Sequence, residues 1–158
     1  MTIYAIDPGP THSGFVIFDP EAMRVVESDK ALANANVMQW CRDKFFSAPH
    51  EFACECIEAM YAHVGKETVQ TIRFCGAIEE AVISRGGFIH MLSPQEVKKR
   101  VCGTASAKDP AVRQALIDRL GPPGTKKNPG PTFGVSSHAW RALAVAVAAT
   151  ISQPPPEA

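Results

Sequence analysis

The fold of this 158-residue chain is decided near its start, by residues 3–9, Ile-Tyr-Ala-Ile-Asp-Pro-Gly. The first four of these residues are apolar or aromatic, which predicts a short strand. The Pro8-Gly9 pair cannot continue a strand and indicates a tight turn. Asp7 is therefore predicted to stand at the tip of the first strand, with its carboxylate at the edge of a sheet.

Two further strands are predicted directly after this turn. Residues 14–19, Gly-Phe-Val-Ile-Phe-Asp, form the second strand, and residues 23–27 form the third after a Pro-Glu-Ala turn at 20–22. Connections this short join antiparallel neighbours, so the three strands are expected to form a meander. Residues 31–46 then carry apolar side chains at helical spacing, which predicts a helix.

The rest of the chain alternates strands with helices. Strands are predicted at 51–57 and 88–92, and helices at 65–84, 94–101, 109–120 and 139–151. Ser93-Pro94 and Asp109-Pro110 mark two helix starts, because proline suits the first helical turn. We expect Ser136 or Ser137 to cap the last helix. Residues 121–134 hold four prolines and four glycines, which predicts a loop that is mobile before a ligand binds.

These elements predict an α/β fold with a mixed five-stranded sheet, its first three strands antiparallel, flanked by helices. With 46% hydrophobic residues, the chain is long enough to bury one substantial core. We therefore expect one domain over residues 1–151 and a disordered Pro-rich tail at 152–158. No apolar run approaches the roughly 18 residues of a membrane helix. Since a signal-peptide pattern is also missing, we expect a soluble, cytoplasmic protein.

Cysteine usage argues against a disulfide framework. The five cysteines form an odd set without a Cys-x-x-Cys pair, and most have apolar neighbours in the sequence. They are interpreted as reduced core residues in preference to metal ligands. The set is Cys41, Cys54, Cys56, Cys75 and Cys102.

The formal charge is zero overall but unevenly distributed. The 16 basic and 16 acidic side chains cancel, which argues against a protein that coats nucleic acid through its overall charge. Residues 98–127 nevertheless carry a net charge of +6, which leaves −6 elsewhere. This segment is either a solvated helical surface or a phosphate-binding surface. Its bases are Lys98, Lys99, Arg100, Lys108, Arg113, Arg119, Lys126 and Lys127.

A candidate metal site arises if the fourth strand lies beside the first. Asp7 and Glu55 then project from neighbouring strands about 4.8 Å apart, close enough to share a hard cation. Two carboxylates held so close repel unless a cation neutralises them. His138, in the first turn of the last helix, and Glu58, three residues beyond Glu55, are further candidate ligands. The residues alone leave ordinary surface roles open for both.

A series of short motifs runs through nearly the whole chain. They are residues 6–9 followed by Ser13-Gly14, residues 52–55 (Phe-Ala-Cys-Glu), 64–68 (Val-Gly-Lys-Glu-Thr), 97–99 (Val-Lys-Lys), and 134–140 (Gly-Val-Ser-Ser-His-Ala-Trp) leading into Ala-Leu-Ala-Val-Ala at 142–146. In this order and spacing they resemble the RuvC-type Holliday junction resolvases of the RNase H-like superfamily, especially the short RuvC-like proteins of phages and prophages.

The resemblance implies a crossover junction endodeoxyribonuclease that hydrolyses phosphodiester bonds in branched DNA with two Mg²⁺ or Mn²⁺ ions. It implies that Asp7 bridges both ions, that Glu55 and His138 each hold one, and that Lys108 steadies the phosphate. It also implies a homodimer that packs through the helix at 65–84 and cuts a two-fold junction symmetrically. It implies that Lys98 and Lys108 contact phosphates, which favours a phosphate-binding role for the whole basic segment. The candidate DNA-binding residues of that segment are Lys98, Lys99, Arg100, Lys108, Arg113, Lys126 and Lys127.

Two positions depart from the bacterial pattern. Arg141 stands where those enzymes place another aspartate, three residues after His138 and on the same helical face. Because a cation cannot ligate a metal, Arg141 is expected to weaken the second ion site or favour Mn²⁺, or else to hold a DNA phosphate. Glu58 stands where an aromatic side chain often stacks on bases, and Met60 or Tyr61 is the candidate substitute.

Three other interpretations remain. An RNase H-like ribonuclease that trims ribosomal RNA precursors also opens with an Ile-Asp-x-Gly strand, although residues 64–68 and the His138-x-Trp140 motif fit the resolvases better. An actin-like ATPase holds nucleotide phosphates with an Asp-x-Gly turn, but it needs two such domains. A degenerate site at His138 and Arg141 would give a protein that recognises branched DNA without cutting it.

Overall fold

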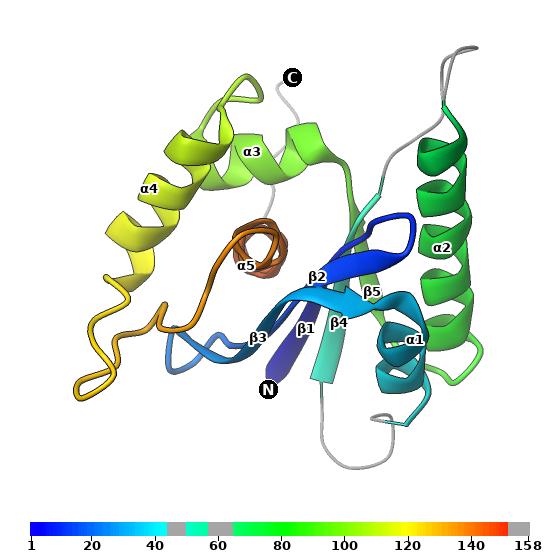
Figure 1. Cartoon of the computed structure of the whole chain (residues 1–158), viewed down its shortest axis with the longest axis horizontal. Helices are drawn as coiled ribbons and strands as arrows, with labels where there is room; N and C mark the ends of the chain where they lie inside the picture. Colours follow the sequence, from blue (N-terminus) through cyan, green and yellow to red (C-terminus); the bar gives the residue numbers. More distant parts are fainter. Residues whose placement is uncertain (44–49, 57–64, 152–158) are drawn as a thin grey trace, which may run out of the picture.

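The computed structural model describes residues 1–43, 50–56 and 65–151, which form one mixed sheet with helices on both faces (Figure 1). The strand order is β3-β2-β1-β4-β5. The strands are β1 Thr2–Asp7, β2 His12–Asp19, β3 Arg24–Ala33, β4 His50–Glu55 and β5 Ile89–Leu92, and the helices are α1 Asn34–Asp43, α2 Lys66–Ile83, α3 Pro94–Cys102, α4 Asp109–Leu120 and α5 Ala139–Thr150. The predicted fold class is confirmed. The expected tail at 152–158 lies outside the described residues.

Strand pairing follows the expected mixed pattern. β1 pairs antiparallel with β2, and β2 antiparallel with β3. β4 lies beside β1 in parallel register, and β5 lies parallel to β4. The expectation that the fourth strand neighbours the first is therefore confirmed. Because β1 and β4 are parallel, their carboxyl ends meet at the same edge of the sheet.

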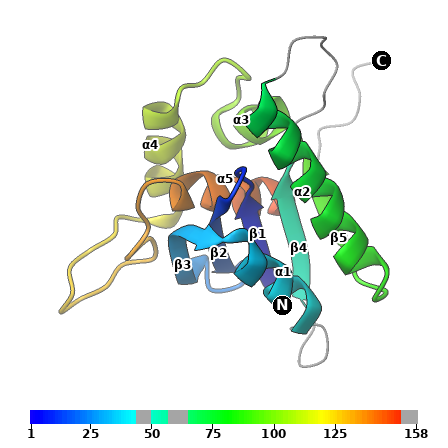
Figure 2. The same cartoon turned by 45° about the vertical axis from the view of Figure 1, so that its right-hand side comes forward.

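Side chains alternate between the two faces of the sheet, and each face has its own core. Tyr4 and Ile6 of β1 pack with α1 and α2, whereas Ile3 and Ala5 pack beneath α5. Figure 1 views α5 nearly end on, with α3 and α4 on its side of the sheet and α1 and α2 on the other. The turned view in Figure 2 shows the same two layers.

Helix α5 forms the centre of one layer. Residues 142–148 of this helix are all buried, because the sheet lies below it and α3 and α4 flank it. An apolar surface all round a helix is typical of such an enclosed position. The many alanines of α5 let it approach β1, β2 and β4 closely, which carries the first turn of α5 to the ends of those strands.

Helix α5 starts at Ala139 as predicted, but its capping residue differs from the predicted one. His138, not Ser136 or Ser137, takes the N-cap position, and its side chain makes no capping hydrogen bond. A backbone turn replaces the serine cap: Ser137 adopts a φ of 48°, and Ala139 N–H donates to the Ser136 carbonyl at 3.0 Å.

Strand β3 is longer than predicted and ends only at Ala33, so α1 begins at Asn34 instead of residue 31. The reason is the extended pairing with β2, in which His12 lies opposite Ala33 and Ser13 opposite Leu32. Ladder hydrogen bonds thus overrode the helical spacing of apolar residues in this stretch.

The loop at 121–134 is held by hydrogen bonds, contrary to the expected mobile segment. Val25 N–H donates to the Pro131 carbonyl at 2.8 Å, which ties the loop to β3. The hydroxyl of Thr132, which is 0% exposed, donates to the Gly121 carbonyl at 3.0 Å. A composition rich in proline and glycine indicates a loop, but these tertiary bonds decide its order.

The five cysteines are thiols, and Cys41, Cys54 and Cys75 are buried. The interpretation of reduced core residues is confirmed for these three, while Cys56 and Cys102 are half-buried. Within the described ranges no helix combines the length and apolarity that a membrane span requires.

Candidate active site

Two carboxylates stand at the ends of neighbouring strands. Asp7 ends β1 and Glu55 ends β4, and these strands are parallel neighbours. Each carboxylate lies two residues beyond a core residue under α5, Ala5 in β1 and Ala53 in β4. Because side chains alternate with a period of two, both carboxylates are turned toward α5.

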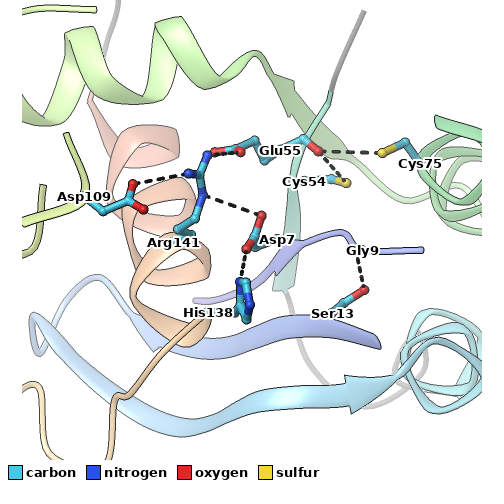
Figure 3. A network of polar contacts seen from close by, with 9 residues as sticks. All are labelled: Asp7, Gly9, Ser13, Cys54, Glu55, Cys75, Asp109, His138 and Arg141. Carbon is cyan, nitrogen blue, oxygen red and sulfur yellow. Dashed lines mark hydrogen bonds and ion pairs between the residues drawn. The ribbon is translucent and has the colours of Figure 1, made fainter. Parts of the chain in front are cut away.

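The first turn of α5 brings two more side chains to these carboxylates (Figure 3). His138 and Arg141 lie three residues apart and so share one face of the helix. His138 Nδ1 lies 3.5 Å from Asp7 Oδ2. Arg141 Nη2 donates to Glu55 Oε1 at 2.6 Å, and its Nε lies 3.8 Å from Asp7 Oδ1. The structure thus brings the predicted Asp7, Glu55 and His138 together, with Arg141 between the two carboxylates.

A third carboxylate comes from α4, at a position that the sequence pattern marks only as a helix start. Asp109 begins this helix and accepts a hydrogen bond from Arg141 Nη1 at 3.3 Å. An acid in the first turn of a helix is explained by the helix dipole alone. No local pattern links Asp109 to Arg141, which is 32 residues away, so only the packing of α4 against α5 indicates the contact.

Burial and charge set the protonation of this cluster. The side chains of Glu55 and Asp7 are only 7% and 13% exposed. Burial and the neighbouring Glu55 raise the pKa of Asp7 to about 6, although Arg141 and His138 lower it. Burial alone would lower the pKa of Arg141, but Glu55, Asp7 and Asp109 outweigh burial and raise it, so the guanidinium stays charged.

Gly14 allows α5 to approach Asp7. In the antiparallel pair of β1 and β2, Gly14 lies directly opposite Asp7. A Cβ on Gly14 would collide with the carbonyl of His138, lying 2.7 Å from its carbon atom. Only a residue without a side chain lets the backbone of His138 rest on β2 at this point. Gly14 therefore positions His138 beside Asp7.

The turn that follows Asp7 is fixed by hydrogen bonds to the start of α1. The Ser13 hydroxyl donates to Asn34 Oδ1 at 2.7 Å, and Asn34 Nδ2 donates to the Gly9 carbonyl at 3.0 Å. Gly9 N–H in turn donates to Ser13 Oγ at 3.3 Å. This closed set of bonds holds the turn, and with it the end of β1 that carries Asp7.

An open pocket of about 540 Å³ lies over the carboxylates and reaches α2. Asp7, Glu55, His138 and Arg141 line one side of it. Glu67, Thr68 and Thr71 of α2 also line it, and the sequence pattern indicates no individual role for any of them. The sequence signal for Glu67 and Thr68 is the Val-Gly-Lys-Glu-Thr motif at 64–68, which has no chemical meaning until α2 is placed against the sheet; Thr71 lies outside this motif.

Three predicted DNA-binding residues lie close to the carboxylate cluster. Lys98 of α3 lines a cavity of about 10 Å³ together with Glu55 and Arg141. Lys108 is exposed and takes the N-cap position of α4, next to Asp109. Arg113 lies over the ring of Trp140, 5.0 Å from its centroid, in a groove of about 740 Å³ between α4 and α5 that begins at His138 and Arg141.

The other predicted DNA-binding residues lie elsewhere. Arg100 is directed to the far end of α5, where its Nη1 donates to the Ala148 carbonyl at 3.2 Å, and only 13% of its side chain is exposed. Lys99 is exposed on α3, and Lys126 and Lys127 are exposed in the loop at 121–134.

The donor set fits one divalent ion better than two. Ligand atoms on adjacent positions of an octahedral ion lie about 3 Å apart, and Asp7 Oδ2 and His138 Nδ1 are 3.5 Å apart. Glu55 instead bonds to Arg141, and no group of three candidate ligand side chains gathers in the part of the chain that the structure describes. Glu58, the fourth predicted ligand, lies outside the described residues.

Comparison with solved structures places this geometry in a known architecture. A structure of Thermus thermophilus RuvC covers 94% of this chain and 92% of its own, with a TM-score of 0.64 and 20% sequence identity. T. thermophilus RuvC in complex with Holliday junction substrate has the same coverage, with a TM-score of 0.66 and 22% identity. The chain has the RuvC fold. No family model and no curated protein matches the sequence.

The RuvC fold explains the layout of the cluster. The mixed sheet with β1 at its centre brings the ends of β1 and β4 under the first turn of α5. At 20–22% identity the likeness to RuvC establishes the fold alone. The chemistry of this chain depends on its own Asp7, Glu55, His138 and Arg141.

Proposed function

We propose that this protein is a divalent-metal-dependent endonuclease that cuts branched DNA, with four-way junctions as its main substrate. One observation carries the proposal: Asp7 and Glu55 end neighbouring strands of a RuvC fold, and Asp7 lies beside His138 at the edge of an open pocket. Two buried carboxylates held together repel unless a cation neutralises them, and imidazole is a suitable ligand for transition metals. The DNA substrate class is supported by the T. thermophilus RuvC structure with Holliday junction.

Asp7 and His138 are the proposed ligands of the ion. Asp7 Oδ2 and His138 Nδ1 converge at 3.5 Å, and 68% of the His138 side chain is exposed, so solvent and DNA reach this point. A bound Mg²⁺ or Mn²⁺ supplies positive charge that activates water and stabilises the phosphate. Glu55 orients Arg141, which lies next to Asp7.

The proposed reaction is hydrolysis of a phosphodiester bond. The oxygen of a water molecule bonds to phosphorus, the bond to the 3′ oxygen breaks, and the proton of the water leaves to solvent while the 3′ oxygen gains one. The residues of this chain position the phosphate: Arg141 neutralises charge from one side, and Lys108, at the start of α4, steadies a phosphate oxygen. Fixed positive charges aimed at developing negative charge lower the barrier.

The proposed DNA path runs from the carboxylates along α3 and α4. Lys98, Lys108 and Arg113 lie along it, and Lys99, Lys126 and Lys127 extend the positive surface. Such contacts supply affinity without sequence specificity. Arg100, which is bonded to the end of α5, contributes less to this surface than the sequence pattern indicates.

We also propose a homodimer, because two active sites are needed to cut a two-fold junction symmetrically. Helix α2 is the candidate interface. One side of it covers the sheet through Cys75, Ile78 and Val82, while Ile83 at its end is 53% exposed. Light scattering at several protein concentrations tests this: a mass near twice 17.0 kDa supports the dimer, and a concentration-independent monomer contradicts it.

The deciding experiment is a strand-resolved cleavage panel with Mg²⁺ and with Mn²⁺. Its substrates are a mobile four-way junction, a three-way junction, a flap, linear duplex DNA and a structured RNA. We expect cleavage of branched DNA only. Asp7→Asn should reduce cleavage by at least about 100-fold, the loss that disturbing even an outer-shell partner of a metal ligand can cause. Junction binding should be preserved, because Lys98 and Lys108 are untouched. Cleavage of the RNA instead would support an RNA-processing nuclease.

A second function is favoured by one observation, the Arg141 guanidinium among the carboxylates. The guanidinium already neutralises part of the negative charge that a metal ion would otherwise neutralise. This would suit a protein that binds branched DNA without cutting it. Binding of the four-way junction with no cleavage in either metal, by wild type and by Arg141→Gln alike, would establish this binding function and contradict the nuclease.

A further inference from the structure

We infer that Arg141 takes the place of a second metal ion, so that the site binds one divalent ion per chain in place of two. This inference rests on the proposed function and deepens it, since it names how the charge at the site is supplied. It replaces the expectation of two ions drawn from the family resemblance.

The first support is that the two oxygens of the Asp7 carboxylate face different side chains. Its Oδ2 faces His138 Nδ1 at 3.5 Å, whereas its Oδ1 faces Arg141 Nε at 3.8 Å. A carboxylate that bridges two cations presents one oxygen to each. Here the oxygen that a second ion would need points to the guanidinium, which also holds Glu55 Oε1 at 2.6 Å.

The second support is charge. Arg141 contacts three carboxylates, those of Asp7, Glu55 and Asp109. With His138 neutral, the three carboxylates and the Arg141 guanidinium together carry a formal charge of −2, which one divalent ion cancels. A second divalent ion would leave a net charge of +2 at the site. That ion would lie next to the positively charged guanidinium, and neighbouring like charges repel strongly in a partly buried site.

The third support is the space around the guanidinium. Behind Arg141, the cavity shared with Lys98 and Glu55 measures about 10 Å³, which is about the room that one water needs. Mg²⁺ usually keeps several of its waters, so no hydrated ion fits on this side of the guanidinium; the space for an ion lies in the pocket over Asp7. The Arg141 side chain is half-buried and that of Glu55 is buried. An ion that separated them would leave a buried charge without its partner, which is costly in free energy.

The position of Arg141 also allows it to act on DNA. A guanidinium has five N–H donors, and the hydrogen bonds of Arg141 to Glu55 and Asp109 use two of them. The side chain is 31% exposed and lines both the pocket over Asp7 and the groove beside α4. A phosphate oxygen placed there meets a fixed positive charge, as it would meet the second ion of a two-metal site.

The test counts Mn²⁺ ions by calorimetric titration of the metal-free protein. We expect one ion for wild type, two for Arg141→Gln, and one for the matched control Arg113→Gln, whose side chain lies on Trp140 in the neighbouring groove. Arg141→Lys, which keeps a positive charge near Glu55, should again bind one. Circular dichroism and thermal unfolding in chelator show whether each variant is folded.

Two results would overturn the inference while leaving the nuclease proposal intact: two Asp7-dependent ions in wild type, or a single ion in folded Arg141→Gln. The wild-type count needs no variant, so it decides the matter even if Arg141→Gln fails to fold. A wild-type protein that binds no Mn²⁺, or binds one ion that Asp7→Asn does not remove, contradicts the proposed metal site and the inference together.

Discussion

Asp7 is held between a carboxylate that disfavours its charge and two side chains that favour it. Glu55 and burial raise its pKa, and Arg141 and His138 offset only part of that rise. A pKa that stays raised in this way is typical of functional sites, where a bound ligand completes the charge balance. The sequence indicates that Asp7 and Glu55 meet, but the value of this pKa depends on the depth at which α5 covers them.

The raised pKa of Asp7 predicts a specific pH dependence of stability in chelator. Between the ordinary pKa of aspartate and about 6, the folded state binds more protons than the unfolded state. The free energy of unfolding should therefore fall as the pH rises from 4 to 7, on the order of 2 kcal/mol for this one group.

Urea denaturation of wild type, Asp7→Asn and Asp118→Asn at a series of pH values checks this prediction. The fall should shrink in Asp7→Asn, which cannot ionise there, and persist in Asp118→Asn, an exposed control on α4. Identical pH profiles for wild type and Asp7→Asn would show that Asp7 does not titrate differently in the folded state.

The contact between β2 and α5 determines whether His138 reaches Asp7. Gly14 lies opposite Asp7 in the sheet and directly beneath the His138 carbonyl. In the sequence, the Ser13-Gly14 motif has a meaning only as part of the family resemblance. Its physical reason is a close approach between elements more than a hundred residues apart, which no local pattern expresses.

Gly14→Ala is expected to push the first turn of α5 away from β2. Stability should fall by about 1–3 kcal/mol, as in other overpacked sites, and Mn²⁺ affinity and cleavage should fall by at least about tenfold. Gly76→Ala in α2 is the matched control, because nothing lies within 4 Å of the added methyl group; it should be neutral or slightly stabilising. Unchanged metal binding in folded Gly14→Ala would refute the positioning role.

The loop at 121–134 is a second example of order that comes from another element. The buried hydroxyl of Thr132 donates to the Gly121 carbonyl, and β3 bonds to Pro131. Thr132→Val keeps the shape of the side chain but leaves that carbonyl without its donor. We expect a loss of about 1–2 kcal/mol and faster tryptic cleavage after Lys127. Cleavage at the wild-type rate would mean that this hydrogen bond does not order the loop.

Charge is segregated over the molecule as a whole. The chain is formally neutral, yet its net charge of +6 over residues 98–127 lies on α3, α4 and the following loop. Lys98 of α3 and the start of α4 lie beside the carboxylates, whereas the loop is bonded to β3 at the other end of the sheet. A neutral protein can thus present a positive surface to DNA and a negative pocket to a metal ion.

Lys108→Ala is expected to weaken junction binding and to reduce the slope of log affinity against log salt by about 0.9, the effect of one lost phosphate contact. Arg24→Ala, at the opposite end of the sheet where Arg24 pairs with Asp19, should leave the slope unchanged. Fluorescence anisotropy with a labelled four-way junction at several salt concentrations measures both. Equal slopes for wild type and Lys108→Ala would remove Lys108 from the DNA path.

Interactions between residues close together in the sequence made much of this fold predictable from the sequence alone. The apolar run at residues 3–6, the turn at Pro8-Gly9 and the helix start at Ser93-Pro94, all confirmed, depend on neighbours a few residues apart. They were enough to predict the α/β class, the order of the elements and the two strand-end carboxylates. The limits of β3 and the cap of α5 were wrong, because ladder pairing and a backbone turn outweighed local preference there.

Only the tertiary structure decided what Arg141 does. In the sequence it is a cation in place of an expected acid, with a DNA phosphate among its possible partners. In the fold, packing of α5 against β1, β4 and α4 brings three carboxylates from three elements around its guanidinium. Electrostatic contacts of this kind depend on distances between elements far apart in the chain, which helix and strand periodicity do not encode.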